Sequence, residues 1–117
     1  MPVWAAATLD ALLVLVFAAV GRASHDEVGV VGGVLLTAWP FLVGAAAGWA
    51  LVRARSHRWP TSVGPGIPVV VGAVVVGMLL RVVTGAGTAF SFVVVATLVL
   101  AALLLGSRVL AARFVRG

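Results

Sequence analysis

The chain contains no cysteine, no lysine and no tyrosine, and it has only three acidic residues. Without cysteine it can form no disulfide framework, no thiolate metal site and no cysteine nucleophile. Charged residues make up 9% of its 117 residues, whereas a soluble domain has about 25%. A water-soluble globule is excluded, because its surface would need many more charged side chains. The hydrophobic share of 63% instead indicates that most of the chain lies in lipid.

Four apolar stretches are long enough to cross a bilayer, which takes about 20 residues in a helix. Charged or Pro/Gly-rich segments separate them, so we expect membrane spans near residues 3–21, 29–52, 66–84 and 88–107. We expect the longest connection from Arg53 to Pro65, and a tight turn at Gly85-Ala86-Gly87, because glycine permits positive φ. The sequence therefore predicts an all-α polytopic membrane protein, with one four-helix transmembrane domain over residues 1–117 arranged as an antiparallel up-down bundle.

The arginines are divided unevenly between the two sides of this bundle. An even number of spans places both termini and the second connection on one side, which then carries arginines 53, 55, 58, 108, 113 and 116. By the positive-inside rule we expect both termini in the cytoplasm and the protein in the cell (inner) membrane. Trp4, Trp49 and Trp59 are expected at the same interface, where indoles are common. These arginines form no basic helix, so we expect anionic lipid and not nucleic acid beside them.

The second span has one face of small residues: Gly29, Gly33, Thr37, Pro40, Gly44 and Gly48 fall in one arc at 100° per residue. Small residues four apart let helices approach closely in lipid. We expect this face, with Gly77 of the third span, to serve helix packing within the chain; a homodimer seam or the wall of a substrate path are the alternatives. Pro40 is expected to kink the helix, and Trp39 is either a packing residue or an aromatic wall for a ligand.

Asp10 is an acidic residue inside the first span, seven residues and about 10 Å from its start. That span is expected to be a helix of the mature protein, since no basic residue precedes its apolar run. Ionisable groups at such depth pair, protonate or carry an ion. Three interpretations follow: a proton- or cation-coupled site, a structural pair with an arginine or a helix end, or an interfacial residue.

Arg81 lies in the outer third of the third span, and we expect it to point toward Asp26 and Glu27 in the first connection. This contact is either part of a site or a structural link between the third helix and that connection. With Arg81, Asp26 and Glu27, an outward-facing polar pocket is expected to include Arg22, Ser24, His25, Thr84, Thr88 and Ser91. Asp10 and Trp39 are further candidates for a substrate or ion pathway. His25-Asp26-Glu27 is too compact for a metal site, so we expect no metal and no cofactor.

Several motifs occur together along the chain, among them Leu9-Asp10, Gly21-Arg22-Ala23-Ser24-His25, Thr37-Ala38-Trp39-Pro40-Phe41, Gly77-Met78-Leu79-Leu80-Arg81 and Gly87-Thr88-Ala89-Phe90-Ser91-Phe92. As a set they resemble a family of small four-helix membrane proteins, mainly actinobacterial and haloarchaeal, known only as a domain of unknown function. The resemblance spans nearly the whole chain and implies a polytopic membrane fold without an assigned activity. A looser similarity to small multidrug resistance transporters would give Asp10 the role of their acidic residue.

Two functions from different classes fit these observations best, and a third, a membrane enzyme acting on lipid, would need Arg22, His25 and Arg81 to bind a head group with His25 as base. The first is a permease or channel-like transporter of a small solute, ion or proton, with Asp10 as its distinguishing residue. The second is a non-catalytic membrane subunit or scaffold that docks through the glycine face of the second helix. We expect no catalytic residues and no enzyme activity, and the partner classes left open are the lipid bilayer, a homo-oligomer and a larger membrane complex.

Overall fold

The computed structural model consists of four helices and describes residues 1–23, 30–86 and 89–114, with all their side chains except those of residues 22, 23 and 30–32. Helix α1 spans Val3–Ala23, α2 Val30–Ser56, α3 Val63–Val83 and α4 Phe90–Phe114. All four are long and apolar enough to cross a membrane. The prediction of an all-α protein with four membrane-length helices is confirmed.

Three helix ends differ from the expected boundaries, and at two of them the helix continues through charged residues near the membrane surface. The expected connection from Arg53 to Pro65 shortens to residues 57–62: α2 continues to Ser56, and α3 starts at Val63 with Pro65 in its first turn, where a proline's missing N–H is harmless. The fourth helix does not end near residue 107 but runs to Phe114. Arg108 therefore lies inside a helix and not in a flanking segment.

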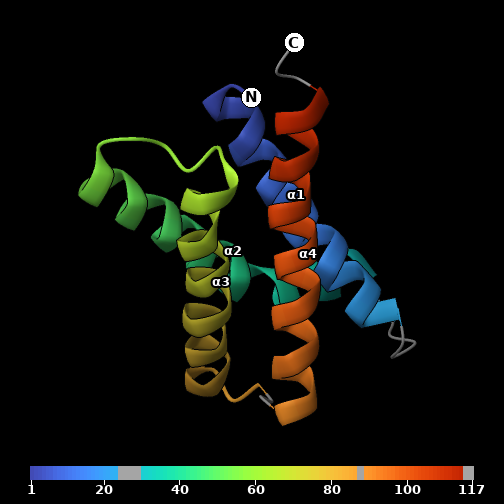
Figure 1. The fold of residues 1–117 in the computed structure, drawn as a ribbon. Coiled ribbons are helices and arrows are strands. Elements are labelled where there is room, and N and C mark those ends of the chain that lie inside the picture. Colours follow the sequence, from blue (N-terminus) through green and yellow to red (C-terminus); the bar gives the residue numbers. More distant parts are fainter. Residues whose placement is uncertain (24–29, 87–88, 115–117) are drawn as a thin grey trace.

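The helices form a closed ring in which α1 contacts α2, α2 contacts α3, α3 contacts α4 and α4 contacts α1 (Figure 1). Helices α3 and α4 lie nearly parallel and run in opposite directions, and α2 crosses behind them at a steep angle. The start of α1, the end of α4 and the 57–62 connection all lie at the top of this view. The start of α1, the end of α4 and the second connection therefore lie on one side of the bundle, as an even number of spans requires.

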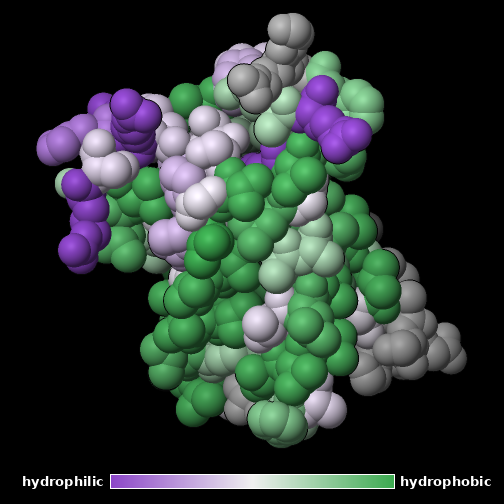
Figure 2. Space-filling view, viewed as in Figure 1, coloured by the Kyte–Doolittle hydropathy of each residue, from purple (hydrophilic) through white to green (hydrophobic). Residues whose placement is uncertain are grey.

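Hydrophilic side chains gather at that same end, and the rest of the visible surface is almost entirely apolar (Figure 2). Exposed side chains there include Arg53, Arg55, Arg58 and Arg113. We call this the arginine end, and the end that holds the α3–α4 turn the opposite end. An apolar band with charge concentrated at one end is the surface expected of a multi-pass membrane protein.

Helices α2 and α3 make the most extensive contact in the ring, and glycines allow it. A Cβ added at Gly44 would collide with the Gly72 carbonyl oxygen and would lie 2.8 Å from the Ala73 Cα. At Gly48 it would lie 2.6 Å from the Val69 Cα. Real Cβ atoms do not approach backbone this closely, so only glycine fits at either position.

Three phenylalanines fill the bundle between the opposite end and its middle. Phe17 of α1 packs edge-on to Phe41 of α2 with ring centroids 5.2 Å apart, and each lies 6.2 Å from Phe92 of α4. Gly77 of α3 makes room for the Phe41 ring, since a Cβ there would lie 2.6 Å from it. We call Phe17, Phe41 and Phe92 the phenylalanine cluster; with Gly77 it joins all four helices.

The turn after α3 has the geometry that its glycine permits. Gly85 has a φ of 80°, which confirms the expectation of a positive-φ residue in this turn. The Ala86 N–H donates to the Arg81 carbonyl (2.7 Å) and the Gly85 N–H donates to the Val82 carbonyl (3.1 Å). These two bonds form a Schellman motif, which ends the helix and turns the chain toward α4.

Candidate functional site

Asp10 of α1 and Arg108 of α4 form a buried ion pair. Arg108 Nη1 donates to Asp10 Oδ1 at 2.8 Å, and Nη2 donates to Oδ2 at 2.7 Å. Asp10 is 4% exposed and Arg108 is 1% exposed. The paired, parallel geometry is the strongest that a guanidinium and a carboxylate can adopt, and it neutralises both charges inside the apolar part of the molecule.

Arg108 also bonds to two backbone carbonyls. Nε and Nη2 donate to the Pro60 oxygen, at 3.1 Å and 2.7 Å, and Nη1 donates to the Leu104 oxygen at 3.0 Å. Gly66 of α3 leaves the space for this side chain, since a Cβ there would lie 2.7 Å from Arg108 Cδ and Nε. Arg108 thus ties α4 to α1 and to the 57–62 connection at once.

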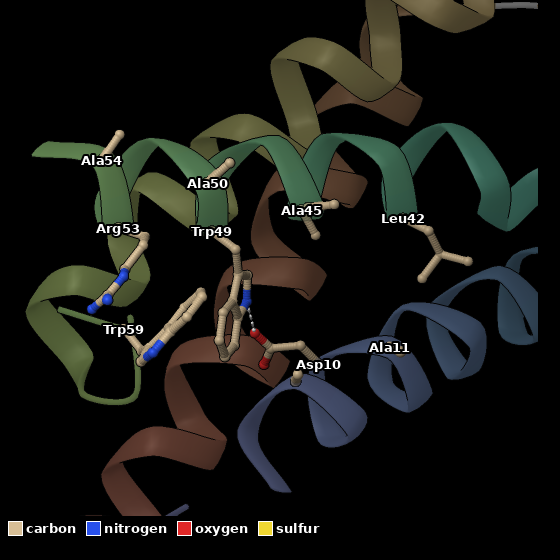
Figure 3. Close-up of a pocket in the computed structure, with 11 residues that line it drawn as sticks. Asp10, Ala11, Leu42, Ala45, Trp49, Ala50, Arg53, Ala54 and Trp59 are labelled. Atoms are coloured by element: carbon tan, nitrogen blue, oxygen red, sulfur yellow. Dashed lines mark hydrogen bonds between the residues drawn. The ribbon is translucent and has the colours of Figure 1, made fainter. Parts of the chain in front are cut away.

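Trp49 of α2 completes the coordination of the carboxylate. Its indole Nε1–H donates to Asp10 Oδ2 at 2.9 Å, the bond drawn dashed in Figure 3. The Trp49 ring lies 6.0 Å from the Trp59 ring, and Arg53 Cζ lies 4.8 Å from the Trp59 ring centroid. Trp49 is therefore a hydrogen-bond partner of the buried pair and more than an interfacial anchor.

A cavity of about 600 Å³ opens beside this pair, between α1 and α2 at the arginine end (Figure 3). Asp10 and Trp49 form part of its wall. Arg53, near the end of α2, and Trp59, in the 57–62 connection, also line it. The rest is apolar: Ala7, Ala11, Leu42, Ala45, Ala46, Ala50 and Ala54. We call this cavity the α1–α2 cleft; its volume lies in the range of small-molecule sites, roughly 300–1,000 Å³.

The pathway candidates that the structure describes lie in different parts of the bundle. Asp10 lies in the arginine-end half, whereas Arg81 is in the last turn of α3 at the opposite end, with its Cζ 4.7 Å from the Phe92 ring centroid. Thr84 caps its own helix by donating to the Leu80 carbonyl at 2.8 Å, and Ser91 is exposed at the start of α4. The Trp39 side chain is 37% exposed and is not part of the cleft wall.

Several expected site residues lie outside the part of the chain that the structure describes. These are Ser24, His25, Asp26, Glu27, Gly29 and Thr88, together with the side chain of Arg22. The expected contact of Arg81 with Asp26 and Glu27 falls on these residues and stays a prediction.

The small-residue face of α2 lies against α3 of the same chain. Gly44 and Gly48 contact the α3 backbone directly, Gly33 and Pro40 are buried, and Thr37 is half-buried. Because α3 already covers Gly44 and Gly48, these two positions offer no free surface to a docking partner, which removes the basis for the scaffold alternative there. Among the described residues, no three His, Asp or Glu side chains come together as a metal site.

Sequence reasoning missed Arg108, which it counted among the membrane-flanking arginines. One feature indicated otherwise: apolar residues resume at Val109 and continue to Ala112, so the helix had no reason to end before Arg108. A buried carboxylate also requires a cation, and the structural-pair interpretation of Asp10 left open which arginine supplies it.

The four-helix unit that holds this site matches a known protein family over most of its length. Residues 7–111, which include both Asp10 and Arg108, match a family described as a protein of unknown function, DUF3054. The chain belongs to the DUF3054 family. The resemblance stated from the sequence motifs is thereby confirmed, and the match covers most of this DUF3054 protein. No curated protein and no solved structure matches the chain.

Proposed function

We propose that this DUF3054 protein is a small permease, which binds a small solute in the α1–α2 cleft and lets it pass toward the opposite end of the bundle. The observation that carries the proposal is the position of Asp10, paired with the buried Arg108, on the wall of a cavity of about 600 Å³. Charged side chains inside membrane spans are costly and usually mark substrate or ion pathways. The proposal assigns no catalytic reaction.

The phenylalanine cluster supports the same proposal because of its place along the helices. Phe17 follows Asp10 by two helical turns on α1, and Phe41 precedes the cleft residues of α2, so the cluster lies between the cleft and the opposite end. Phe41 is fully buried and Phe17 is 5% exposed. A cleft open at one end and closed by packed rings at the other is the arrangement expected of a one-sided resting state in alternating access.

The proposal includes an orientation in the cell (inner) membrane. Arg53, Arg55, Arg58 and Arg113 are exposed at the arginine end, and by the positive-inside rule that end faces the cytoplasm. The cleft then opens toward the cytoplasmic leaflet.

The experiment that tests the proposal measures flux in proteoliposomes that contain a pH-sensitive dye. A potassium gradient with valinomycin supplies the driving force, and proton entry is compared for the wild type, Trp49→Phe and Trp39→Phe. Trp49→Phe keeps an aromatic ring but removes the donor to Asp10, so we expect flux to fall at least threefold. Trp39→Phe makes the same chemical change outside the cleft, and we expect wild-type flux.

Two results would count against the permease. Wild-type flux no greater than that of protein-free liposomes, for protons and for the anionic probe used below, would overturn it. Equal loss of flux in Trp49→Phe and Trp39→Phe would show that the change acts through general stability and not through the cleft. Circular dichroism of each variant in detergent provides the control for folding.

A further inference from the structure

The charges of the α1–α2 cleft do not cancel, and the excess is positive. The Asp10 carboxylate accepts two hydrogen bonds from Arg108 and one from Trp49, so its charge is already neutralised. Arg53 is the other ionised side chain of the cleft wall, and its Nη1 donates to an uncharged acceptor, the His57 carbonyl, at 2.6 Å. Within the described residues, the cleft with Arg108 therefore carries a net charge of one unit, and that charge is Arg53's.

This arrangement argues against a cation as the occupant. A cationic solute would have to compete with Arg108 for Asp10, and breaking a buried, doubly hydrogen-bonded pair is costly. An anion needs no such exchange, because the Arg53 guanidinium keeps N–H groups that no described residue accepts and lies on the exposed rim. The role of Asp10 suggested by the similarity to multidrug transporters is thus poorly matched to its surroundings.

The remainder of the wall fits an apolar body. Ala46 and Ala50 of α2 and Ala7 and Ala11 of α1 line the cleft, and Leu42 is the lining residue of α2 farthest from Arg53 along the helix. Small side chains leave a groove along α2, with the cationic group at its rim and apolar carbon along its length. This is the shape and polarity of an amphiphile with one head group and one tail.

We propose that the α1–α2 cleft binds an amphiphile that has a single anionic head group, with Arg53 holding the head and the alanine-lined groove holding the apolar tail. Arg53 is kept in place by its bond to the His57 carbonyl and by stacking on Trp59. A free alkyl anion and an anionic lipid share this chemistry. The inference rests on the proposed function in that the bound amphiphile would be the transported solute. Binding itself is tested separately from transport.

The absence of native cysteine allows a direct test. Ala46→Cys places one thiol on the exposed part of the cleft wall, and its modification by uncharged N-ethylmaleimide is timed in nanodiscs of phosphatidylcholine. We expect 1-octanesulfonate to slow modification at least fivefold. Methanesulfonate lacks the tail and octyltrimethylammonium reverses the head charge, so neither should protect at the same concentration.

The matched variants are Arg53→Gln and Arg55→Gln, which remove the same charge two residues apart in the last turn of α2. Arg55 lies beside a different groove, between α2 and α3. We expect Arg53→Gln to raise the protecting concentration of 1-octanesulfonate about tenfold, Arg53→Lys to restore most of the protection, and Arg55→Gln to have no effect. Nanodiscs that contain phosphatidylglycerol distinguish an anionic lipid from a free alkyl anion. Slower modification of Ala46→Cys in these nanodiscs, without added 1-octanesulfonate, identifies an anionic lipid as the occupant.

The outcomes separate this inference from the permease. Equal protection by the sulfonate and by octyltrimethylammonium, or equal effects of Arg53→Gln and Arg55→Gln, would overturn the anionic class while leaving the flux result untouched. Protection without uptake of 1-octanesulfonate or of protons into proteoliposomes would keep the binding site and reject the permease.

Discussion

Asp10 and Arg108 are the two buried charged side chains among the described residues, and two hydrogen bonds join them. Removing one partner of a buried ion pair costs about 3–5 kcal/mol, since the other charge is left without compensation. Replacing both partners with uncharged groups costs much less. The pair is therefore expected to behave as a single energetic unit.

We expect Asp10→Asn and Arg108→Met each to destabilise the protein by about 3 kcal/mol or more, whereas the double variant loses less than the sum of the two. Unfolding in mixed micelles of increasing sodium dodecyl sulfate fraction, followed by circular dichroism, measures all three. Costs that simply add would mean that the two side chains do not depend on each other, which is incompatible with the two hydrogen bonds that join them.

At the residue scale, the sequence supported part of this site. The depth of Asp10 showed that a carboxylate in the first span needed a partner or a function. The identity of the partner depends on the rotation of α4 about its axis and on a contact between residues 98 positions apart. Neither quantity follows from local periodicity, so the sequence did not identify which arginine pairs with Asp10.

Among the elements, the α2–α3 contact depends most strictly on residue size. Gly44 lies against the backbone of Gly72 and Ala73, which cannot rotate away as a side chain could. Gly106 of α4, by contrast, has no atom within 4 Å of the position where a Cβ would lie. The two glycines are both helical but have opposite steric surroundings.

We expect Gly44→Ala to destabilise the protein by about 3 kcal/mol, because the added methyl group forces α2 and α3 apart. Gly106→Ala adds the same methyl group in open space and should be neutral or stabilising by up to about 1 kcal/mol, the usual gain in helix propensity. The same detergent unfolding measurement compares them. Destabilisation by Gly106→Ala as large as by Gly44→Ala would indicate that Gly106 is covered by another molecule, such as a second copy.

The number of helices was more predictable than the positions of their ends. Apolar runs of about 20 residues indicated four helices because a bilayer fixes the required length. The ends were misplaced wherever a charged residue was taken as the limit, at Arg53 and at Arg108. Arginine has a long apolar stem and a good helix propensity, so a helix continues through it and the guanidinium reaches water or a buried partner.

At the scale of the whole molecule, the main asymmetry of the described residues is that exposed arginines gather at one end. Arg58 is exposed in the 57–62 connection at the arginine end, and Thr84 is exposed beside the α3–α4 turn at the opposite end. These two positions therefore report opposite faces of the membrane in a chain that has no thiol of its own.

We expect a membrane-impermeant maleimide to label Thr84→Cys in intact cells and to label Arg58→Cys only after the membrane has been permeabilised. The physical reason is the retention of arginine-rich segments on the cytoplasmic side during insertion. Blocking with a permeant maleimide beforehand is the control for specificity. The reverse labelling pattern would place the arginine end outside and would make the cleft face the exterior.

The hydrogen bonds of Arg108 can form only after α4 has been inserted beside α1 and the 57–62 connection. Asp10 belongs to α1, which leaves the ribosome before α4, and its cationic partner belongs to α4. Until α4 is inserted, the first helix holds a carboxylate without that cation, and the Pro60 carbonyl lacks its two guanidinium donors. Any chain that terminates before residue 108 therefore keeps a buried acid that Arg108 never neutralises. The Asp10–Arg108 pair thus gives a chain that contains α4 a different charge state in α1 from a chain that lacks α4.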